Sequence, residues 1–291
     1  MMKYDIVIPV SYKDCWILKK NIRYIRDNLI GANKIYVILN RDLFRCFKSD
    51  FLSKYSVYLI DENCLALNLN FKEVKNALFE KGLDRLTGWY FQQFLKMAFA
   101  FYENVEDYYL VWDSDTFPIN KISFFDNQCR VLVNPKREHH QPYFDMINKI
   151  LGDNCKFASY SFISEHMMFK TSYMKELIQI IASKQNLDIS LWWKFIIENS
   201  DSKINQNFSE FELYGTYLFN NYPESFVIRN LITFRSGGKF FGRTVTKEEL
   251  KYLSYDFDTV SFERGQIPNG IRGLKCMIIK KWIEITHILH L

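Results

Sequence analysis

Apolar and polar positions follow one another in short blocks along the first half of the chain. Residues 4–10, 34–39 and 57–60 are apolar runs rich in β-branched and aromatic side chains, and we predict a strand for each. Between the first two runs, residues 14–29 place apolar side chains at helical spacing. Strand, helix and strand repeated with short connections is typical of a doubly wound, mostly parallel sheet. We therefore expect an α/β fold in which the carboxyl ends of the strands line one crevice.

One further apolar run ends abruptly in two acids. Residues 108–112 are followed by Asp113-Ser114-Asp115, and Pro118 then stops the strand. Side chains alternate along an extended chain, so Asp113 and Asp115 point to the same side. Two carboxylates held this close repel each other, and Mn²⁺ or Mg²⁺ would relieve the repulsion while holding substrate phosphates. The pattern indicates a metal and diphosphate site.

An Asp-x-Asp sequence after a strand can also be an ordinary solvated turn, because Asp and Ser are common turn residues. The run before it, however, is apolar without alternation, as in a strand that is buried on both faces. Such strands present ligand sites at their carboxyl ends. This context favours the metal site over the turn.

The segment from Leu110 to Thr116 resembles the aspartate motif of glycosyltransferases with the GT-A fold. Residues 87–96 and 208–215 are similar to a bacterial group of such enzymes, the DUF6492 family, over about residues 4 to 241. The resemblance implies a GT-A fold, which is Rossmann-like and has a mixed, mostly parallel sheet flanked by helices. It also implies a metal-dependent hexosyltransferase with Mn²⁺ or Mg²⁺ on Asp113 and Asp115. The donor would be a nucleotide-sugar, first of all a UDP-sugar, and the acceptor a glycan or a lipid-linked glycan of capsule, O-antigen or lipooligosaccharide synthesis.

The donor site that the resemblance implies lies around the first strand and the two acids. Any of its loop residues could equally be an ordinary surface polar group. Gln92 and Lys96 also belong to the expected donor site. They are four residues apart on a predicted helix over residues 89–102, so both side chains lie on one face of it. The Lys96 cation could reach a diphosphate from there. The expected donor-binding residues are Pro9, Val10, Ser11, Tyr12, Asn40, Asp61, Gln92, Lys96, Asp113, Ser114 and Asp115.

Two acids stand at the start of another predicted helix. Ser209 is a good N-cap, and it places Glu210 and Glu212 in the first turn, where the helix dipole favours carboxylates for structural reasons alone. The resemblance points to a functional carboxylate at such a helix start. If the reaction inverts the anomeric centre, Glu210 or Glu212 would accept the proton of the acceptor; if it retains, no such base is needed.

Glu165 and His166 stand inside an apolar, strand-like run over residues 161–169, where unpaired polar groups would be costly. They could be satisfied core residues, or they could bind acceptor or metal, and His166 is a further catalytic candidate. The cationic segment over residues 229–243 could bind a leaving diphosphate or an anionic acceptor. The expected acceptor-binding residues are Glu165, His166, Arg235 and Lys239.

After residue 245 the sequence changes to a charged Lys-Glu-Glu segment and mixed loops. We therefore expect a glycosyltransferase domain over residues 1–245 and an extension over residues 246–291. The extension ends in a predicted helix that is amphipathic and basic. The helix could bind an anionic membrane, or its stripe could pack on the domain's own core or on a partner subunit. The apolar stripe is Leu274, Ile278, Trp282, Ile285 and Leu289, and the basic residues around it are Arg272, Lys275, Lys280 and Lys281.

Composition narrows the class of protein. A net charge of +5 does not demand nucleic acid as a partner, and the six cysteines form no Cys-x-x-Cys pair, so structural zinc is not expected. No stretch approaches the ~20 apolar residues of a membrane span, and residues 1–9 lack a signal-peptide core. We expect a cytoplasmic enzyme, with peripheral attachment at the inner face of the membrane as an option.

Two other functions stay open. A sugar-phosphate nucleotidyltransferase would use a similar sheet and metal site, but residues 10–14 lack the glycine-rich loop that such enzymes usually carry. A non-catalytic glycan-binding protein on the same fold is the second alternative. The absence of a Gly-x-Gly-x-x-Gly or P-loop pattern disfavours a dehydrogenase or an ATPase.

Overall fold

The computed structural model describes residues 2–152 and 160–288. Its centre is a five-stranded sheet in the order β3-β2-β1-β4-β7. The first four of these strands are parallel, and β7 pairs antiparallel with β4. The strands are β1 (Tyr4–Pro9), β2 (Ala32–Leu39), β3 (Val57–Asp61), β4 (Tyr108–Trp112) and β7 (His166–Lys170). The predicted class, an α/β fold with a mixed, mostly parallel sheet flanked by helices, is confirmed.

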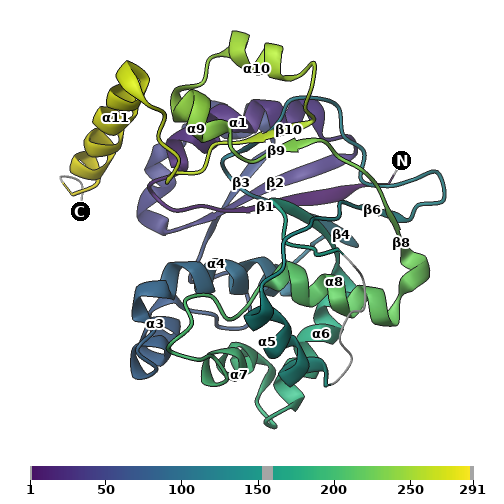
Figure 1. The fold of residues 1–291 in the computed structure, drawn as a ribbon. Coiled ribbons are helices and arrows are strands. Elements are labelled where there is room, and N and C mark those ends of the chain that lie inside the picture. The colour runs from purple at the N-terminus through teal and green to yellow at the C-terminus, as the bar shows by residue number, and fades with distance from the viewer. Residues whose placement is uncertain (1, 153–159, 289–291) are drawn as a thin grey trace.

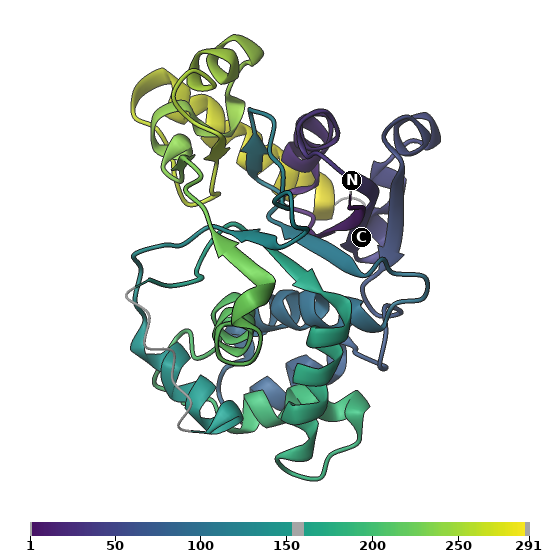
Figure 2. The same cartoon turned by 90° about the vertical axis from the view of Figure 1, so that its right-hand side faces the viewer.

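Helices lie on both faces of this sheet (Figure 1). The view in Figure 2 agrees, with the teal and green helices on one face and the yellow-green C-terminal elements on the other. The helices are α1 (Cys15–Asn28), α2 (Ser49–Tyr55), α3 (Phe71–Glu80), α4 (Thr87–Ala98), α5 (Gln141–Leu151), α6 (Thr171–Ser183), α7 (Trp192–Glu198), α8 (Glu210–Asn221), α9 (Gly237–Phe241), α10 (Lys247–Leu253) and α11 (Gly270–Ile288). Short 3₁₀ turns cover Arg41–Cys46, Asp84–Leu86, Phe99–Phe101, Ile189–Leu191, Pro223–Ser225 and Gly242–Thr244.

The continuous apolar runs of the sequence are the strands at the centre of the sheet. Every residue of β1 is buried, and four of the five residues of β4 are. Both strands have a neighbour on each side and helices on each face, so their side chains are buried, with Tyr108 at the start of β4 as the partly exposed one. The absence of alternation in these runs therefore had a structural cause.

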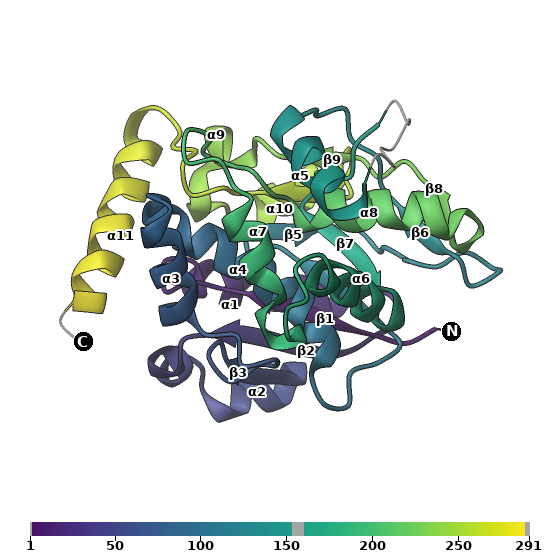
Figure 3. The same cartoon turned by 90° about the horizontal axis from the view of Figure 1, so that it is seen from below.

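Two small sheets complete the fold. One contains β5 (Thr116–Pro118), β10 (Thr259–Ser261) and β9 (Thr233–Phe234), and the other pairs β6 (Val131–Val133) with β8 (Phe226–Ile228). Because β10 pairs with β5, the segment after residue 245 shares a sheet with the residues directly after the Asp-Ser-Asp motif. The domain boundary at residue 245 stays a prediction, and Figure 3 shows α11 at one edge of the molecule.

The strand-like run over residues 161–169 is a strand only in its second half, since β7 begins at His166. After β7 follow two helices, α6 and α7, separated by a turn in which Asn186 has φ 52°. Asn adopts this left-handed conformation at little cost, and an α-helix cannot continue through it.

Gly215 lets α8 lie against the segment before β7. A Cβ atom at this position would lie 2.0 Å from the Cδ2 atom of Phe162, a ring that is 1% exposed. We expect Gly215→Ala to destabilise the protein by roughly 1–3 kcal/mol through overpacking, in spite of the better helix propensity of alanine. Urea unfolding of the variant measures this cost.

Gly88 provides the matched control, because it is also helical and a Cβ atom there would meet nothing within 4 Å. Gly88→Ala should leave the free energy of unfolding unchanged or raise it. Equal stabilities of the two variants would contradict the close approach at Gly215.

Candidate active site

The parallel strands β1, β2 and β4 end at one edge of the sheet, and a cavity of about 530 Å³ opens there. This volume is within the range of small-molecule sites. Seven of the predicted donor-binding residues line the cavity: Pro9, Val10, Ser11, Tyr12, Asn40, Gln92 and Ser114. The topology thus brings together residues that are far apart in the sequence.

Glu62, and not the predicted Asp61, lines the cavity. Asp61 is the last residue of β3 and uses its carboxylate to accept the backbone N–H of Asn63 at 3.0 Å. The Asn40 side chain donates to Glu62 at 3.4 Å, and burial raises the pKa of Glu62. Glu62 is the first residue of the turn after β3, so its side chain leaves the backbone in a different direction from that of Asp61.

Lys96 of α4 is buried between two carboxylates. Its Nζ atom lies 3.2 Å from Oδ1 of Asp113 and 2.9 Å from Oε1 of Glu210, and only 7% of its side chain is exposed. Burial alone would lower the pKa of Lys96, but Asp113 and Glu210 together raise it, so the amine is a fixed cation. The ring of Phe211 packs against the ammonium group, with 4.6 Å between Nζ and the ring centroid.

Asp113 directly follows β4, and Asp115 lies in a turn that the N–H of Thr116 closes by donating to the carbonyl of Asp113 at 3.2 Å, so the extended alternation predicted for the two acids does not hold here. Burial, with a further contribution from the charges of Asp113 and Asp14, raises the pKa of Asp115 to about 7, although Arg243 opposes the rise. The pKa of Asp113 is also raised, first by burial, although the Lys96 cation lowers it. Negative charge is therefore in excess around Asp115 even with Arg243 nearby.

A divalent cation fits this pair of carboxylates. Among residues 2–152 and 160–288, no group of three or more His, Cys, Asp and Glu side chains is arranged to hold a metal. Mg²⁺ usually takes one or two protein carboxylates and completes its coordination with water and substrate phosphates. Two acids beside a cavity that could admit a diphosphate satisfy that requirement, and Asp113 and Asp115 are the residues that would hold the ion.

The structure separates the two acids at the start of α8. Ser209 is the N-cap and accepts the N–H of Glu212, as predicted. Glu210 points to Lys96, and its backbone N–H donates to Oε1 of Gln93 at 3.1 Å. Glu212 is fully buried, and its carboxylate accepts the backbone N–H of Phe162 at 2.7 Å. Glu210 therefore belongs to the site, and Glu212 connects α8 to the segment before β7.

Glu165 and Arg235, two residues predicted for the acceptor region, form an ion pair. Arg235 donates to Glu165 with 2.8 Å between Nε and Oε1, and Lys136 lies 3.1 Å from Oε2. Glu165 is 3% exposed, and its backbone carbonyl accepts the N–H of Asp113. Nothing in the sequence distinguished Lys136 from its basic neighbour Arg137. The predicted Lys239 lies exposed on α9.

His166 lies on the other face of the sheet. It pairs with Trp112 across β4 and β7, and its ring stacks on the indole with 4.8 Å between centroids. Phe124 contacts the ring from another side at 5.6 Å, and Nδ1 has no hydrogen-bond partner among the described residues. Trp112 and Asp113 are consecutive, so the imidazole faces away from Lys96. The core interpretation of His166 fits this geometry better than a catalytic one.

The model of the DUF6492 family, described as a family of unknown function, matches residues 1–228. The chain belongs to the DUF6492 family. The match contains Lys96, Asp113, Asp115 and Glu210, while Arg235 and α11 lie beyond it. No curated protein matches the chain.

Several solved structures are similar in fold, and they are glycosyltransferases. Mouse xyloside xylosyltransferase 1 in its apo form is 10% identical with a TM-score of 0.42, over 91% of this chain and 99% of that one. The galactosyltransferase LgtC in complex with donor and acceptor sugar analogues is 11% identical with a TM-score of 0.43, over 89% and 86%. Apo GlyE of Streptococcus pneumoniae TIGR4 is 13% identical with a TM-score of 0.42, over 96% and 60%. At these sequence identities and TM-scores, the structural similarity does not indicate which activity this DUF6492 member has.

The buried imidazole of His166 makes the stability depend on pH. Burial lowers the pKa of His166 well below 6.5, and the charges of Arg229 and Lys136 add to this effect. The stability that this group contributes is complete above the unfolded-state pKa and is lost as the pH falls. Between pH 7 and pH 5 we expect a loss of up to about 2 kcal/mol from this residue.

His166→Phe should remove this contribution, because it keeps the aromatic contacts and has no titratable group. Urea unfolding at pH 7 and pH 5 compares the two proteins. If the wild type and the variant lose the same free energy of unfolding, His166 is not buried as a neutral group.

Proposed function

We propose that this protein is a metal-dependent glycosyltransferase that moves a sugar from a nucleoside-diphosphate donor to a glycan acceptor. The observation that carries the proposal is that buried Lys96 pairs with Asp113 at the end of β4, while Ser114, between Asp113 and Asp115, lines the cavity at the strand ends. A cavity of this volume has room for a nucleoside, and the cation and the two acids are proposed to bind the donor's diphosphate next to it. This arrangement supports chemistry at a diphosphate.

Each residue of the site has a role in this proposal. Mn²⁺ or Mg²⁺, held by Asp113 and Asp115, would supply charge neutralisation for the leaving diphosphate. Lys96 is held in position by its two carboxylate partners, so it needs no reorganisation when charge develops nearby. Glu210 is the candidate for the functional carboxylate below the anomeric carbon, because Glu212 is occupied by the Phe162 N–H.

The assignments of the donor and the acceptor rest on the same site. We propose a UDP-sugar as the donor and a glycan or lipid-linked glycan as the acceptor, in the cytoplasmic synthesis of capsule, O-antigen or lipooligosaccharide. Glu165 and Arg235 support the acceptor region, because an ion pair beside Asp113 offers both a hydrogen-bond acceptor and donors to sugar hydroxyls.

Hydrolysis and binding of a panel of UDP-, GDP- and CMP-sugars, with and without Mn²⁺, test the function. We expect metal-dependent turnover of one donor class, and Asp115→Asn should lower it at least about a hundredfold, because the loss of metal affinity removes several kcal/mol of stabilisation. The exposed Asp256 provides the control, since Asp256→Asn makes the same change far from the cavity.

Binding of no donor by the wild-type protein would end the proposal. Release of pyrophosphate from a nucleoside triphosphate and a sugar phosphate would instead identify a nucleotidyltransferase.

We also propose that α11 attaches the enzyme to an anionic membrane surface. Its stripe does not pack on the domain core: Leu274 is 55% exposed, Ile278 60%, Trp282 65% and Ile285 53%. Lys275 and Lys281 lie on either side of the stripe by helical spacing, which suits a headgroup layer. Leu289 lies outside the described residues. No helix in the described part of the chain is long and apolar enough to cross a membrane.

Flotation with anionic liposomes tests the attachment. The wild-type protein should float, and Leu274→Gln with Ile278→Gln should reduce the bound fraction severalfold, because both side chains leave the apolar face. Tyr252→Gln with Tyr255→Gln is the matched control, since these residues are 72% and 74% exposed elsewhere. If the stripe variant floats as well as the wild type, α11 is not the attachment.

A further inference from the structure

Asn21 is a polar residue in the buried face of α1. It is fully buried, and it shares that face with Leu18, Ile22 and Ile25. Asparagine is a poor helix former, and its side-chain amide needs hydrogen-bond partners when it is removed from water. An apolar residue would suit this helix position better, so the amide of Asn21 needs a reason other than packing.

The side-chain NH₂ group of Asn21 joins two backbone carbonyls. Its Nδ2 atom lies 2.7 Å from the carbonyl oxygen of Thr116 and 3.1 Å from that of Ser114. Both partners can only accept, so the NH₂ side of the amide has to point to them. The Oδ1 atom of Asn21 has no hydrogen-bond partner among the described residues. The structure therefore uses this side chain for its two donors and leaves its acceptor unpaired.

The two carbonyls belong to the residues on either side of Asp115. Asp115 lies in the turn between β4 and β5, which the Thr116 N–H closes onto Asp113. The carbonyl of Asp115 accepts the N–H of Phe262, the residue after β10, at 3.0 Å. Each of the three consecutive carbonyls over residues 114–116 is thus bound from outside the turn, and Asn21 binds two of them.

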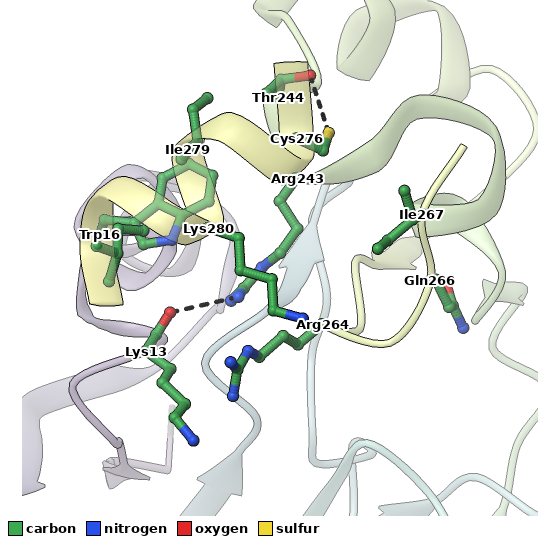
Figure 4. A pocket seen from close by; sticks show the side chains of 11 residues that line it. Lys13, Trp16, Arg243, Thr244, Arg264, Gln266, Ile267, Cys276, Ile279 and Lys280 are labelled. Carbon is green, nitrogen blue, oxygen red and sulfur yellow. Dashed lines mark hydrogen bonds between the residues drawn. The ribbon is translucent and has the colours of Figure 1, made fainter. Parts of the chain in front are cut away.

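The carboxylate of Asp115, in contrast, is left without a protein partner. Among residues 2–152 and 160–288, no N–H or O–H group donates to it. Arg243 does not bind it, because the terminal N–H groups of Arg243 donate to Asp14 at 2.6 Å and to the carbonyl of Lys13 at 3.4 Å. Figure 4 shows the second of these bonds. The direction of the Asp115 carboxylate is therefore determined by the backbone of its turn.

We propose that Asn21 is a positioning residue, which orients the Asp115 carboxylate for the divalent cation by fixing the backbone on both sides of it. This role rests on the proposed function, because it requires a metal ion on Asp113 and Asp115. Groups that orient a metal ligand typically change metal affinity by about 10–100-fold when they are lost. Helix α1 also begins directly after residues 9–14, which line the cavity, so one helix connects the cavity wall to the turn.

Titration of the full chain with Mn²⁺ alone, followed by the electron paramagnetic resonance signal of free Mn²⁺, tests this role without donor or turnover. Asn21→Leu keeps the size of the side chain and removes both donors. We expect it to raise the Kd for Mn²⁺ about 10–100-fold, because the turn is no longer fixed beside Asp115. Asn21→Ala is the second variant, with the same expected direction, and urea unfolding confirms that each protein is folded in the titration.

Asn28→Leu is the matched control. Asn28 is the last residue of α1, and its Nδ2 atom donates to the carbonyl of Pro118 at 2.7 Å. The control removes the same kind of bond between α1 and β5, but Pro118 is not next to Asp115, so the Kd for Mn²⁺ should stay that of the wild type.

A wild-type Kd in the folded Asn21 variants, or an equal rise in the control, would overturn the positioning role. If the wild type itself binds no Mn²⁺, the proposed metal site fails and this role fails with it. The two failures are distinguishable, because the second is seen without any variant.

Discussion

The buried Lys96 ammonium is the constraint on which the rest of the site depends. It joins the end of β4, through Asp113, to the start of α8, through Glu210, and it is anchored in α4. A buried cation is tolerated only with close carboxylate partners, and removing one partner of such a group typically costs about 3–5 kcal/mol. The ion pairs therefore fix the relative positions of three elements. They also place the amine beside the acids that we propose for the metal, so the same interactions hold the fold and position these side chains.

Acids are in excess around Asp115, where burial and neighbouring carboxylates raise its pKa to about 7. Arg243 opposes this rise, and it forms an ion pair with Asp14 at 2.6 Å. A divalent cation held by Asp113 and Asp115 would remove the remaining local repulsion.

Face alternation explains which candidate residues belong to the site. Asp113 and Trp112 are neighbours in the sequence, yet one reaches Lys96 and the other stacks on His166 across β7. Glu210 and Glu212 are two positions apart on a helix, where such a step turns the side chain to a different face. One carboxylate reaches the Lys96 group, and the other accepts a backbone N–H.

The sequence by itself determined the class of fold, because unbroken apolar runs and helical spacing report burial locally. It also located the two acids after β4 and the cap at Ser209, since each depends on residues within a few positions. Only the tertiary structure decided that Lys96 lies between Asp113 and Glu210, that Lys136 joins Glu165, and that Asn21 binds the carbonyls on both sides of Asp115. These groupings depend on strand order and on the packing of the helices, which are set by contacts between residues far apart in the chain. No local sequence pattern encodes these groupings. The sequence therefore could not show which lysines and glutamates contact one another.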